Sequence, residues 1–364
     1  MSSWGNKVRI SIFGESHGPA IGAVLEGLPA GEAIDLDAGL VQMRRRAPGQ
    51  GRFSTPRREA DTPKLLSGVL DGRTTGAPLA VLIENTNTRS QDYQNLLEVP
   101  RPGHADYPAW VKYRGGNDVR GGGHFSGRLT APLGFAGAVC RQRLLRPGLH
   151  IGAHALSIGP VRDDAFPVEI PNEMLDALAQ ESFPTLNPNA KARMLDEIED
   201  ARKALDSVGG VIECAVTGLR AGLCGEGMFG GIEGLFSSIF FGIPAVKGVA
   251  FGAGFHAAAM RGSEHNDPYY FDAAGRVRTR TNNAGGSLGG ISTGMPLVCT
   301  VAVKPTASVA RPRESVYLRT RQNTTLEVHG RHDPCIVPRA VPVVEAAAAV
   351  ALLNIDGILE TEDR

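Results

Sequence analysis

The chain has 364 residues, which is long enough for one large domain or two of average size. Lys plus Arg and Asp plus Glu balance at 38 each, and this argues against a partner such as nucleic acid or an anionic membrane. The five cysteines form no C-x-x-C pair and no apolar run approaches the ~20 residues of a membrane span, so we expect a cytoplasmic protein without a disulfide scaffold or a zinc site.

The hydrophobic pattern predicts the same series of elements twice along the chain. The first series has strands at residues 9–13 and 79–84 and helices at 37–46 and 130–145. The second series has strands at residues 210–217 and 297–303 and helices at 228–241 and 343–353. An amphipathic helix at 190–205 falls between the two series. Pro132 and Pro342 would lie in the first turns of the two alanine-rich helices that close each series.

Three sequence blocks also recur in the same order and indicate a duplicated fold. GLPAG at 27–31 resembles GLRAG at 218–222, TGAPL at 75–79 resembles TGMPL at 293–297, and residues 128–139 resemble residues 339–350. We therefore predict an α/β (α+β) fold in which one domain spans 1–364 as a β-α-β sandwich. Its pseudo-equivalent halves would cover about 1–150 and 205–364, with a helical insert at about 170–206.

Glycine and arginine clusters indicate a small polyanionic ligand. Glycine accounts for 46 of the 364 residues, or about 13%, whereas ~7% is usual. It gathers in runs such as 121–123 that let backbone approach a ligand. Arginines gather between residues 44 and 58 and again between 311 and 339. Guanidinium groups pair well with phosphate and carboxylate, although a salt-bridged surface is the alternative interpretation.

Four histidines lie in loops rich in glycine or proline: His17 in FGESHG, His104 in RPGHADY, His124 in RGGGHFSG and His332 in GRHDPC. FGESHG also fits the serine-hydrolase pattern G-x-S-x-G, but the residues before it leave no room for the oxyanion loop of that fold. The histidines show no metal-binding spacing. We predict that they transfer protons near neutral pH, with Asp106 and Asp333 as matching carboxylates.

Seven motifs occur in order: FGESHG at 13–18, RRR at 44–46, IENTN with RSQDY within 83–93, RPGHADY at 101–107, NNAGGSLGGISTG at 282–294, KPTAS at 304–308 and GRHDPC at 330–335. In these motifs and their order the chain resembles the chorismate synthase family, from about residue 13 to residue 356. The resemblance implies a lyase that eliminates phosphate from 5-enolpyruvylshikimate 3-phosphate in a 1,4-anti reaction and gives chorismate. A diverged homologue that binds flavin or phosphate without this activity is the alternative.

The resemblance also implies the cofactor and the partners. Reduced FMN would be required without net redox change, and NADPH would be an indirect reductant. We expect an external flavin reductase or other reductant, because no reductase domain is recognisable in the sequence. Family members are usually homotetramers.

Site residues follow from the resemblance motif by motif. His17, beside Ser16, would protonate the departing phosphate, His104 would act near the N1/O2 edge of the flavin, and Asp333 would accept the proton by way of flavin N5. Ser126 completes this catalytic set. The cofactor-binding set comprises His124, Phe125, Ser126, Ala245, Gly289, Lys304, Pro305, Thr306, Ala307, Ser308 and Arg331. The set for the substrate or NADPH comprises Arg45, Arg46, Arg52, Arg128 and Arg339.

Three departures from the family pattern affect these assignments. The family usually has GGGRSSARETA where this chain has GGGHFSGRLTAP, so His124 and Phe125 replace an arginine and a serine. Ala47 is an insertion after the arginine triplet, which leaves open whether Arg45 or Arg46 matches the family arginine. The usual asparagine before Ala245 is Pro244 here. A flavin that is bound more weakly or seated differently is the consequence we expect.

Overall fold

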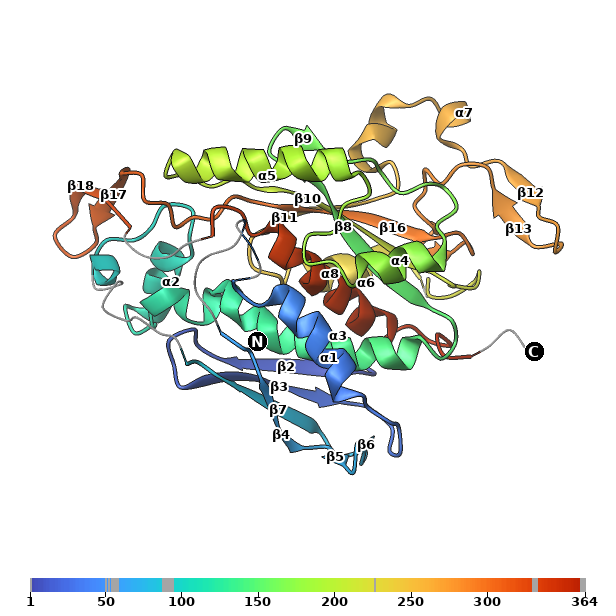
Figure 1. Cartoon of the computed structure of the whole chain (residues 1–364), viewed down its shortest axis with the longest axis horizontal. Helices are drawn as coiled ribbons and strands as arrows, with labels where there is room; N and C mark the ends of the chain where they lie inside the picture. The colour runs from blue at the N-terminus through green and yellow to red at the C-terminus, as the bar shows by residue number, and fades with distance from the viewer. Residues whose placement is uncertain are drawn as a thin grey trace.

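Two five-stranded antiparallel sheets enclose a layer of helices, so the chain forms a β-α-β sandwich (Figure 1). The computed structural model describes residues 2–49, 51, 53, 59–86, 95–225, 227–328 and 333–360. The first sheet has the order β1-β2-β3-β7-β4, with strands β1 (Ser3–Trp4), β2 (Arg9–Gly14), β3 (Ala20–Glu26), β7 (Leu79–Glu84) and β4 (Pro63–Ser67). The second has the order β11-β16-β10-β8-β9, with strands β11 (Val246–Phe251), β16 (Leu297–Val303), β10 (Gly210–Thr217), β8 (His150–Ile158) and β9 (Val161–Arg162).

Helices and short hairpins complete the described chain. The helices are α1 (Leu36–Arg46), α2 (Asp106–Tyr113), α3 (Thr130–Leu144), α4 (Asn172–Leu178), α5 (Pro188–Lys203), α6 (Ile232–Phe240), α7 (Gly262–His265) and α8 (Val337–Leu352). The 3₁₀ turns are η2 (Arg120–Phe125), η3 (Gly127–Leu129) and η4 (Gly254–Ala259). The hairpins are β5–β6 (Val69–Leu70, Arg73–Thr74), β12–β13 (Tyr269–Phe271, Val277–Thr279), β14–β15 (Ser287–Leu288, Ile291–Ser292) and β17–β18 (Arg313–Tyr317, Gln322–Leu326).

Helices α3 and α8 lie at the centre of the sandwich because neither has a continuous polar face. Nearly every residue of α8, and most of α3, is buried. A helix that is apolar on all sides must be covered on all sides. Helix α3 packs against β2, β3 and β7, helix α8 packs against β8 and β10, and the two helices pack against each other. This arrangement confirms the predicted fold class.

Helix α8 begins earlier than its sequence suggests. It starts at Val337 instead of near residue 343, so Pro338 occupies the first turn and Pro342 lies inside the helix. The prediction that Pro342 marks the helix start was wrong. An interior proline removes the hydrogen bond to the carbonyl four residues earlier, here that of Pro338. Burial of both sides of α8 keeps the helix continuous across this position.

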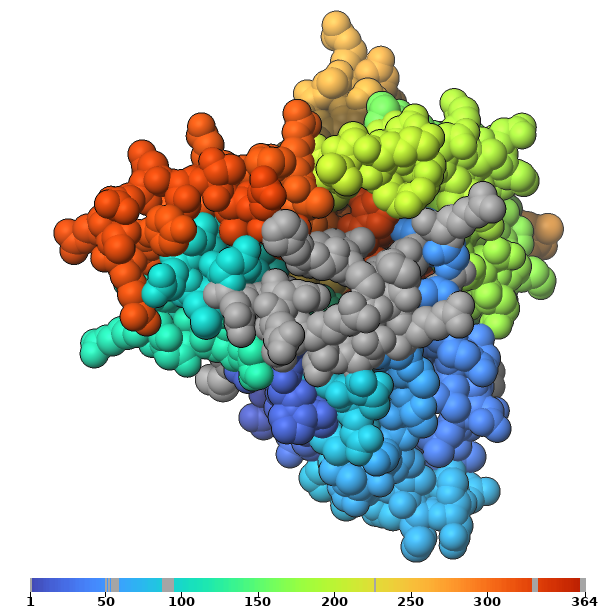
Figure 2. Space-filling model, turned by 60° about the vertical axis from the view of Figure 1, so that its left-hand side comes forward, coloured from blue at the N-terminus to red at the C-terminus, as the bar shows by residue number. Residues whose placement is uncertain are grey.

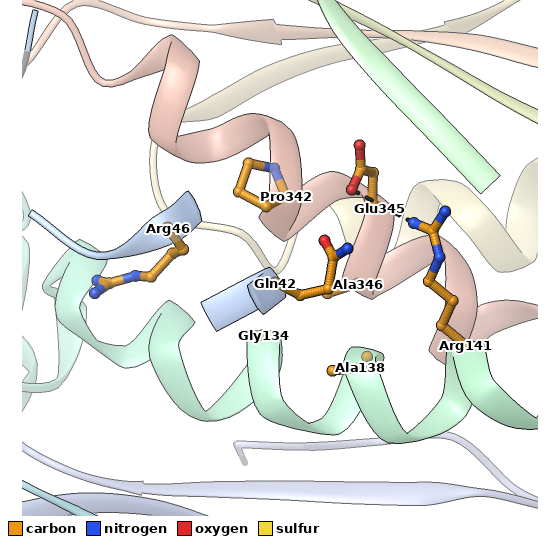
Figure 3. A pocket seen from close by; sticks show the side chains of 9 residues that line it. Gln42, Arg46, Gly134, Ala138, Arg141, Pro342, Glu345 and Ala346 are labelled. Carbon is orange, nitrogen blue, oxygen red and sulfur yellow. Dashed lines mark ion pairs between the residues drawn. The ribbon is translucent and has the colours of Figure 1, made fainter. Parts of the chain in front are cut away.

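A buried ion network ties α1, α3 and α8 together. Arg45 donates to both carboxylate oxygens of Glu345, at 2.5 and 3.1 Å, and the amide of Ala153 donates to Glu345 at 3.1 Å. Arg141 approaches Glu345 at 3.7 Å from α3. A void of about 10 Å³ lies beside Glu345 and Arg141. Figure 3 shows the side chain of Arg46 directed away from these two residues. Arg45 and Arg46 therefore point in different directions from α1.

The crossing of α3 and α8 depends on one glycine, and this gives a stability prediction. A Cβ atom on Gly137 would collide with the backbone and side chain of Ala346. We expect Gly137→Ala to lower the free energy of unfolding by about 1–3 kcal/mol, because the helices must separate. A Cβ atom on Gly134, also on α3, would meet no atom within 4 Å beyond the backbone of its own helix. Gly134→Ala should therefore be neutral or stabilising by up to about 1 kcal/mol. Urea unfolding of both variants measures the difference, and equal effects would contradict the packing argument.

The two sheets share their strand order, which supports the predicted duplication. The order β2-β3-β7-β4 in the first sheet corresponds to β8-β10-β16-β11 in the second. Equivalent turns also share hydrogen bonds, since Gly31 N donates to Thr74 O at 2.7 Å and Gly222 N donates to Ser292 O at 2.9 Å. By this correspondence the second half would begin with β8, before the helices α4 and α5, and not at residue 205. Evolutionary duplication itself stays a prediction.

Two predicted helices have shifted ends. Helix α6 begins at Ile232 and not at residue 228, because Gly230 and Gly231 precede it. Met228 and Phe229 are consequently outside the helix, with exposed fractions of 90% and 93%. Helix α5 ends at Lys203, and Leu205 follows with a positive φ of 56°.

The β17–β18 hairpin packs against the chain that leads to RPGHADY. Leu96 and Val99 form a small buried cluster with Leu326 and Val328. Ser315 Oγ donates to the carbonyl of Pro100 at 2.6 Å. Figure 2 shows these C-terminal and middle segments, in orange and cyan, side by side on one face. Among the helices of the described residues, none combines the length and apolarity required to cross a bilayer.

Candidate active site

A cavity of about 810 Å³ lies where segments from both halves of the chain meet. Its volume is within the ~300–1,000 Å³ typical of small-molecule sites. The lining comes from the segments 16–17, 46–48, 101–105, 121–130, 241–247, 304–308 and 333–343, together with Glu59. Three imidazoles, those of His17, His104 and His124, therefore line one space together with several cations and apolar side chains.

His17 is held on the turn between β2 and β3. Ser16 Oγ donates to the carbonyl of Arg120 at 3.1 Å and lies 3.1 Å from His17 Nδ1. Since the hydroxyl proton is used on Arg120, Ser16 is placed to accept from Nδ1–H. Asn85 secures the turn by donating to the carbonyls of Glu15 and Gly18 at 3.0 and 2.8 Å. His17 is thus fixed at the cavity wall with only 8% of its surface exposed.

Consecutive glycines of η2 pack against two of the site histidines. All three glycines at 121–123 have positive φ, between 53° and 92°, which other L-residues rarely adopt. A Cβ atom on Gly121 would collide with the ring of His17, and one on Gly122 would lie 2.9 Å from His104 Nε2. The glycine run therefore lets backbone approach both imidazoles.

His104 takes its orientation from Asp106 at the start of α2. Its Nδ1 lies 2.5 Å from Asp106 Oδ1. Arg101 donates to the same carboxylate from Nε at 2.7 Å and from Nη2 at 2.8 Å. Burial works to raise the pKa of Asp106, but the hydrogen bonds from Arg101 and His104 outweigh it and hold that pKa far below its usual value. The carboxylate is therefore ionised and can only accept, so the 2.5 Å contact assigns a proton to Nδ1 of His104, although Arg101 Nη2 also lies 3.2 Å from this nitrogen.

Two buried arginines share one aspartate at the cavity floor. Arg46 Nη1 donates to Asp61 at 2.8 Å, and Arg128 Nη1 donates to the other oxygen of Asp61. Arg46 also donates to Thr130 Oγ1 at 3.0 Å. Burial lowers the pKa of Arg46 to about 10, which still leaves it charged at neutral pH. Burial works to raise the pKa of Asp61, but Arg46 and Arg128 hold it below its usual value.

Arg339 connects Asp333 to the end of α1. Its Nη1 donates to Asp333 Oδ2, and its Nε donates to the carbonyl of Arg46 at 3.0 Å. Glu59 lies 3.4 Å from Arg128 at the same wall. Carboxylates thus hold the arginines in place and balance their charge. The guanidinium groups present oriented donors to the anionic groups of a ligand.

The segment 304–308 forms the part of the cavity wall next to Gly103 and Arg101. Lys304 Nζ donates to the carbonyl of Gly103, and its amide donates to the carbonyl of Ala245 at 3.0 Å. Burial, and secondarily Lys247, lower the pKa of Lys304. Thr306 Oγ1 is buried and makes no hydrogen bond within the described structure. Because buried hydroxyls are normally paired, Thr306 marks a position where a polar ligand atom would fit.

Aromatic rings replace the usual family residues beside η2. The rings of His124 and Phe125 lie 4.0 Å apart between centroids, and Tyr113 packs edge-on against His124 at 5.8 Å. Both His124 and Phe125 line the cavity. Such a wall suits contact with a planar ring more than pairing with a phosphate.

The structure brings most predicted site residues together. Those that line the cavity are Ser16, His17, Arg46, His104, His124, Phe125, Ser126, Arg128, Ala245, Lys304, Pro305, Thr306, Ala307, Ser308, Asp333 and Arg339. Ser126 also caps η3, since its Oγ accepts from Arg128 N at 3.2 Å. Arg52 and Arg331 lie outside the described residues.

Two predicted site residues lie elsewhere. Arg45 is not part of the cavity lining, because its guanidinium is engaged by Glu345 between the helices. Arg46 is therefore the arginine of this pair that lies at the cavity, and which of the two matches the family arginine stays a prediction. Gly289 lies in the turn of the β14–β15 hairpin, also apart from the lining.

Sequence reasoning missed several groups that shape the cavity. Asp61 and Glu59 balance the arginines, and Lys247 and Phe241 line the wall near Ala245. Arg101 could have been found from the sequence, because it is the first residue of the motif RPGHADY. Asp61 lies outside every motif, and its pairing with Arg46 and Arg128 arises only in the folded chain. Among the described residues, no group of three or more His, Cys, Asp or Glu could hold a metal ion.

Comparisons with known proteins agree with one another. The chorismate synthase family model matches residues 8–356. Chorismate synthases from Korarchaeum cryptofilum and Thermococcus gammatolerans are 45% and 47% identical to the chain, and each alignment covers 96% of both proteins. A solved structure titled "Crystal Structure of Chorismate Synthase" superposes with a TM-score of 0.75 at 28% identity, covering 96% of this chain and 92% of that one. On these grounds the chain belongs to the chorismate synthase family.

Proposed function

We propose that the protein is a chorismate synthase, a lyase that removes phosphate and a hydrogen from 5-enolpyruvylshikimate 3-phosphate to give chorismate. One observation carries this proposal beyond family membership. His17, His104 and Asp333 line the same cavity as Arg46, Arg128 and Arg339, although these residues come from widely separated segments of the chain. A binding module for phosphate would need the arginines alone, whereas proton-transferring groups in the same space support catalysis.

The arginines would bind the anionic groups of the substrate. Arg46 and Arg128 flank Asp61, and Arg339 lies across Asp333, so each guanidinium is already oriented by a carboxylate. Preorganised donors lose little entropy when a ligand binds. Phosphate and carboxylate on one substrate would thus be held at defined positions.

His17 would donate a proton to the departing phosphate. Phosphate leaves more readily when its charge is reduced, and a buried imidazole can supply a proton near neutral pH. Ser16 would orient the ring through Nδ1. Asp333 would take up the proton that the ring carbon loses, with Arg339 stabilising the carboxylate. The reaction then consists of one proton donated to phosphate and one proton removed from carbon.

The cavity suits reduced FMN, the cofactor that the family resemblance implies. The unpartnered hydroxyl of Thr306, the nearby ammonium groups of Lys304 and Lys247, and the rings of His124 and Phe125 match the polar and planar parts of such a molecule. When bound, reduced flavin supplies transient electron density for an elimination whose C–H bond is hardly acidic. His104 would lie beside the flavin and control its protonation state. NADPH would act only as an indirect electron source through an external reductant.

We extend the proposal to the homotetramer implied by the family. Apolar side chains are exposed over the second half of the chain, including Phe229 at 93%, Phe255 at 90% and Phe271 at 75%. Exposed apolar side chains of this size are frequently covered by protein partners. Gly289, which the family resemblance assigns to the cofactor-binding set, lies in the same half on the β14–β15 hairpin and outside the cavity lining.

Anaerobic turnover tests the proposal. The protein would be incubated with 5-enolpyruvylshikimate 3-phosphate and dithionite-reduced FMN, and phosphate release would be followed together with chorismate absorbance. We expect both products in equal amounts, and no turnover with oxidised FMN. Binding of FMN and substrate without either product would favour the diverged, inactive homologue instead.

A further inference from the structure

A carboxylate that is not itself in the cavity controls one of the site imidazoles. Asp106 is only 5% exposed and is absent from the described cavity lining, whereas His104 lines the cavity. Asp106 accepts from four donors: His104 Nδ1 at 2.5 Å, Arg101 Nε at 2.7 Å, Arg101 Nη2 at 2.8 Å and the Arg101 amide at 3.0 Å. The carboxylate thus has little freedom to rotate.

Arg101 extends this arrangement to the segment 304–308. Its Nη1 donates to Ser308 Oγ at 3.0 Å, and its side chain is 3% exposed. One guanidinium therefore joins RPGHADY to KPTAS, two segments that lie far apart in sequence. Its fork geometry permits simultaneous bonds to a carboxylate and a hydroxyl, which a lysine could not reproduce.

We propose that Asp106, held by Arg101, is a positioning residue that fixes the Nδ1–H tautomer of His104 and so presents Nε2 as the reactive nitrogen. This inference rests on the proposed function only for its kinetic consequences. An imidazole has one proton in its neutral form, and a carboxylate on one nitrogen decides which nitrogen carries it. Gly122 packs against this end of the ring, since a Cβ atom there would lie 2.9 Å from Nε2. A ring flip would break the contact with Asp106.

Arg101 acts together with Asp106 on His104. The guanidinium compensates the negative charge of the carboxylate, and the two groups together hold the ring of His104 in place. In the described structure Lys304 Nζ donates to the carbonyl of Gly103, next to His104, and the neutral hydroxyl of Ser308 accepts from Arg101.

The direct test is the protonation pattern of His104 in the wild-type protein. ¹⁵N chemical shifts of the imidazole, assigned by comparison with His104→Gln, distinguish the two neutral tautomers. At pH 8 we expect Nδ1 to be protonated and Nε2 to be unprotonated. Protonation of Nε2 instead would overturn the proposal, whether or not the protein has the elimination activity.

Kinetics of Asp106→Asn provide the second readout. We expect kcat to fall roughly 10- to 100-fold with KM changed less than about threefold, because the substrate anions bind elsewhere. The ¹⁵N spectrum of the variant should show a mixture of tautomers. Asp106→Glu keeps the carboxylate and should recover part of the lost kcat. A purely structural role would instead lower folding stability while leaving kcat of the folded fraction and the tautomer unchanged.

Asp176→Asn is a matched control. Asp176 contacts His150 Nδ1 at 2.9 Å, but both residues lie away from the cavity lining. We expect kcat and KM within twofold of wild type. If Asp106→Asn does not fold, the wild-type spectrum and Asp106→Glu still decide the question. If the wild-type protein gives no chorismate, the function fails while the spectroscopic test of positioning stands independently.

Discussion

Replacement of His17 by alanine should reduce turnover by about 10²–10⁴-fold while oxidised FMN and substrate still bind. That range is what a positioned general acid typically contributes. His17 is fixed by Ser16 and packed against Gly121, so the lost ring leaves no neighbouring imidazole on its turn to replace it. The arginines that would bind the substrate anions come from other segments and should keep their positions. The effect should therefore appear in kcat and not in KM.

Anaerobic steady-state kinetics, together with isothermal titration with substrate and oxidised FMN, measure this outcome. His256→Ala is the matched control, because His256 is exposed on η4 and does not line the cavity. It should retain wild-type turnover. Unchanged turnover in His17→Ala would reject His17 as the proton donor, whereas loss of both turnover and binding would indicate a collapsed turn.

Strong local patterns in the sequence predicted most of the fold. Strands β7, β10 and β16 have the predicted bounds, because their apolar residues lie between clear glycine and proline turns. The ends of α6 and α8 were less predictable. Two glycines shorten α6, and burial between two sheets carries α8 through Pro342. Local propensity cannot anticipate such an outcome, because the packing comes from distant parts of the chain.

The site was predictable where a motif places a residue on a short turn. FGESHG, RPGHADY and KPTAS all reach the same cavity. Arg45 shows the limit of this reasoning: it and Arg46 are sequence neighbours, but about 100° of helix rotation per residue directs one toward Glu345 and the other toward Asp61. Neither Asp61 nor Glu345 could be recognised as a partner from the sequence, because each lies more than ten residues from the arginine that it binds.

One buried histidine of the second sheet, outside the motifs, has two carboxylate partners. His154 on β8 is fully buried, with Nδ1 3.0 Å from Asp163 Oδ2 and Nε2 3.0 Å from Glu213 Oε2. Asp163 also accepts from the amides of Leu186 and Asn187 at 2.7 and 2.9 Å, at the start of α5. Since both ring nitrogens face carboxylates, the imidazole must carry two protons. A buried histidinium thus joins β8, β10 and the insert.

The charge of His154 makes folding stability depend on pH. Burial works to lower the pKa of His154, but Asp163 and Glu213 outweigh it and raise that pKa above 6.5. Below about pH 6.5 both the folded and the unfolded chain hold the proton, so the stabilisation is fully present. As pH rises through the folded-state pKa, the folded chain loses the proton and the stabilisation disappears. Stability attributable to His154 should therefore decline from pH 6 to pH 9.

His154→Gln should lower the free energy of unfolding by about 3–5 kcal/mol at pH 6, because two buried carboxylates lose their shared cation. The difference from wild type should shrink as pH rises above about 6.5, because wild-type His154 loses its proton as the pH passes its raised folded-state pKa. His150→Gln, which alters the partly exposed pair with Asp176, should cost no more than about 1 kcal/mol at pH 6. Urea denaturation at pH 6, 7.5 and 9 compares the three proteins. A difference between wild type and His154→Gln that stays constant over this range would mean that the imidazole is neutral in the folded chain, and a difference that grows would reverse the assigned sign.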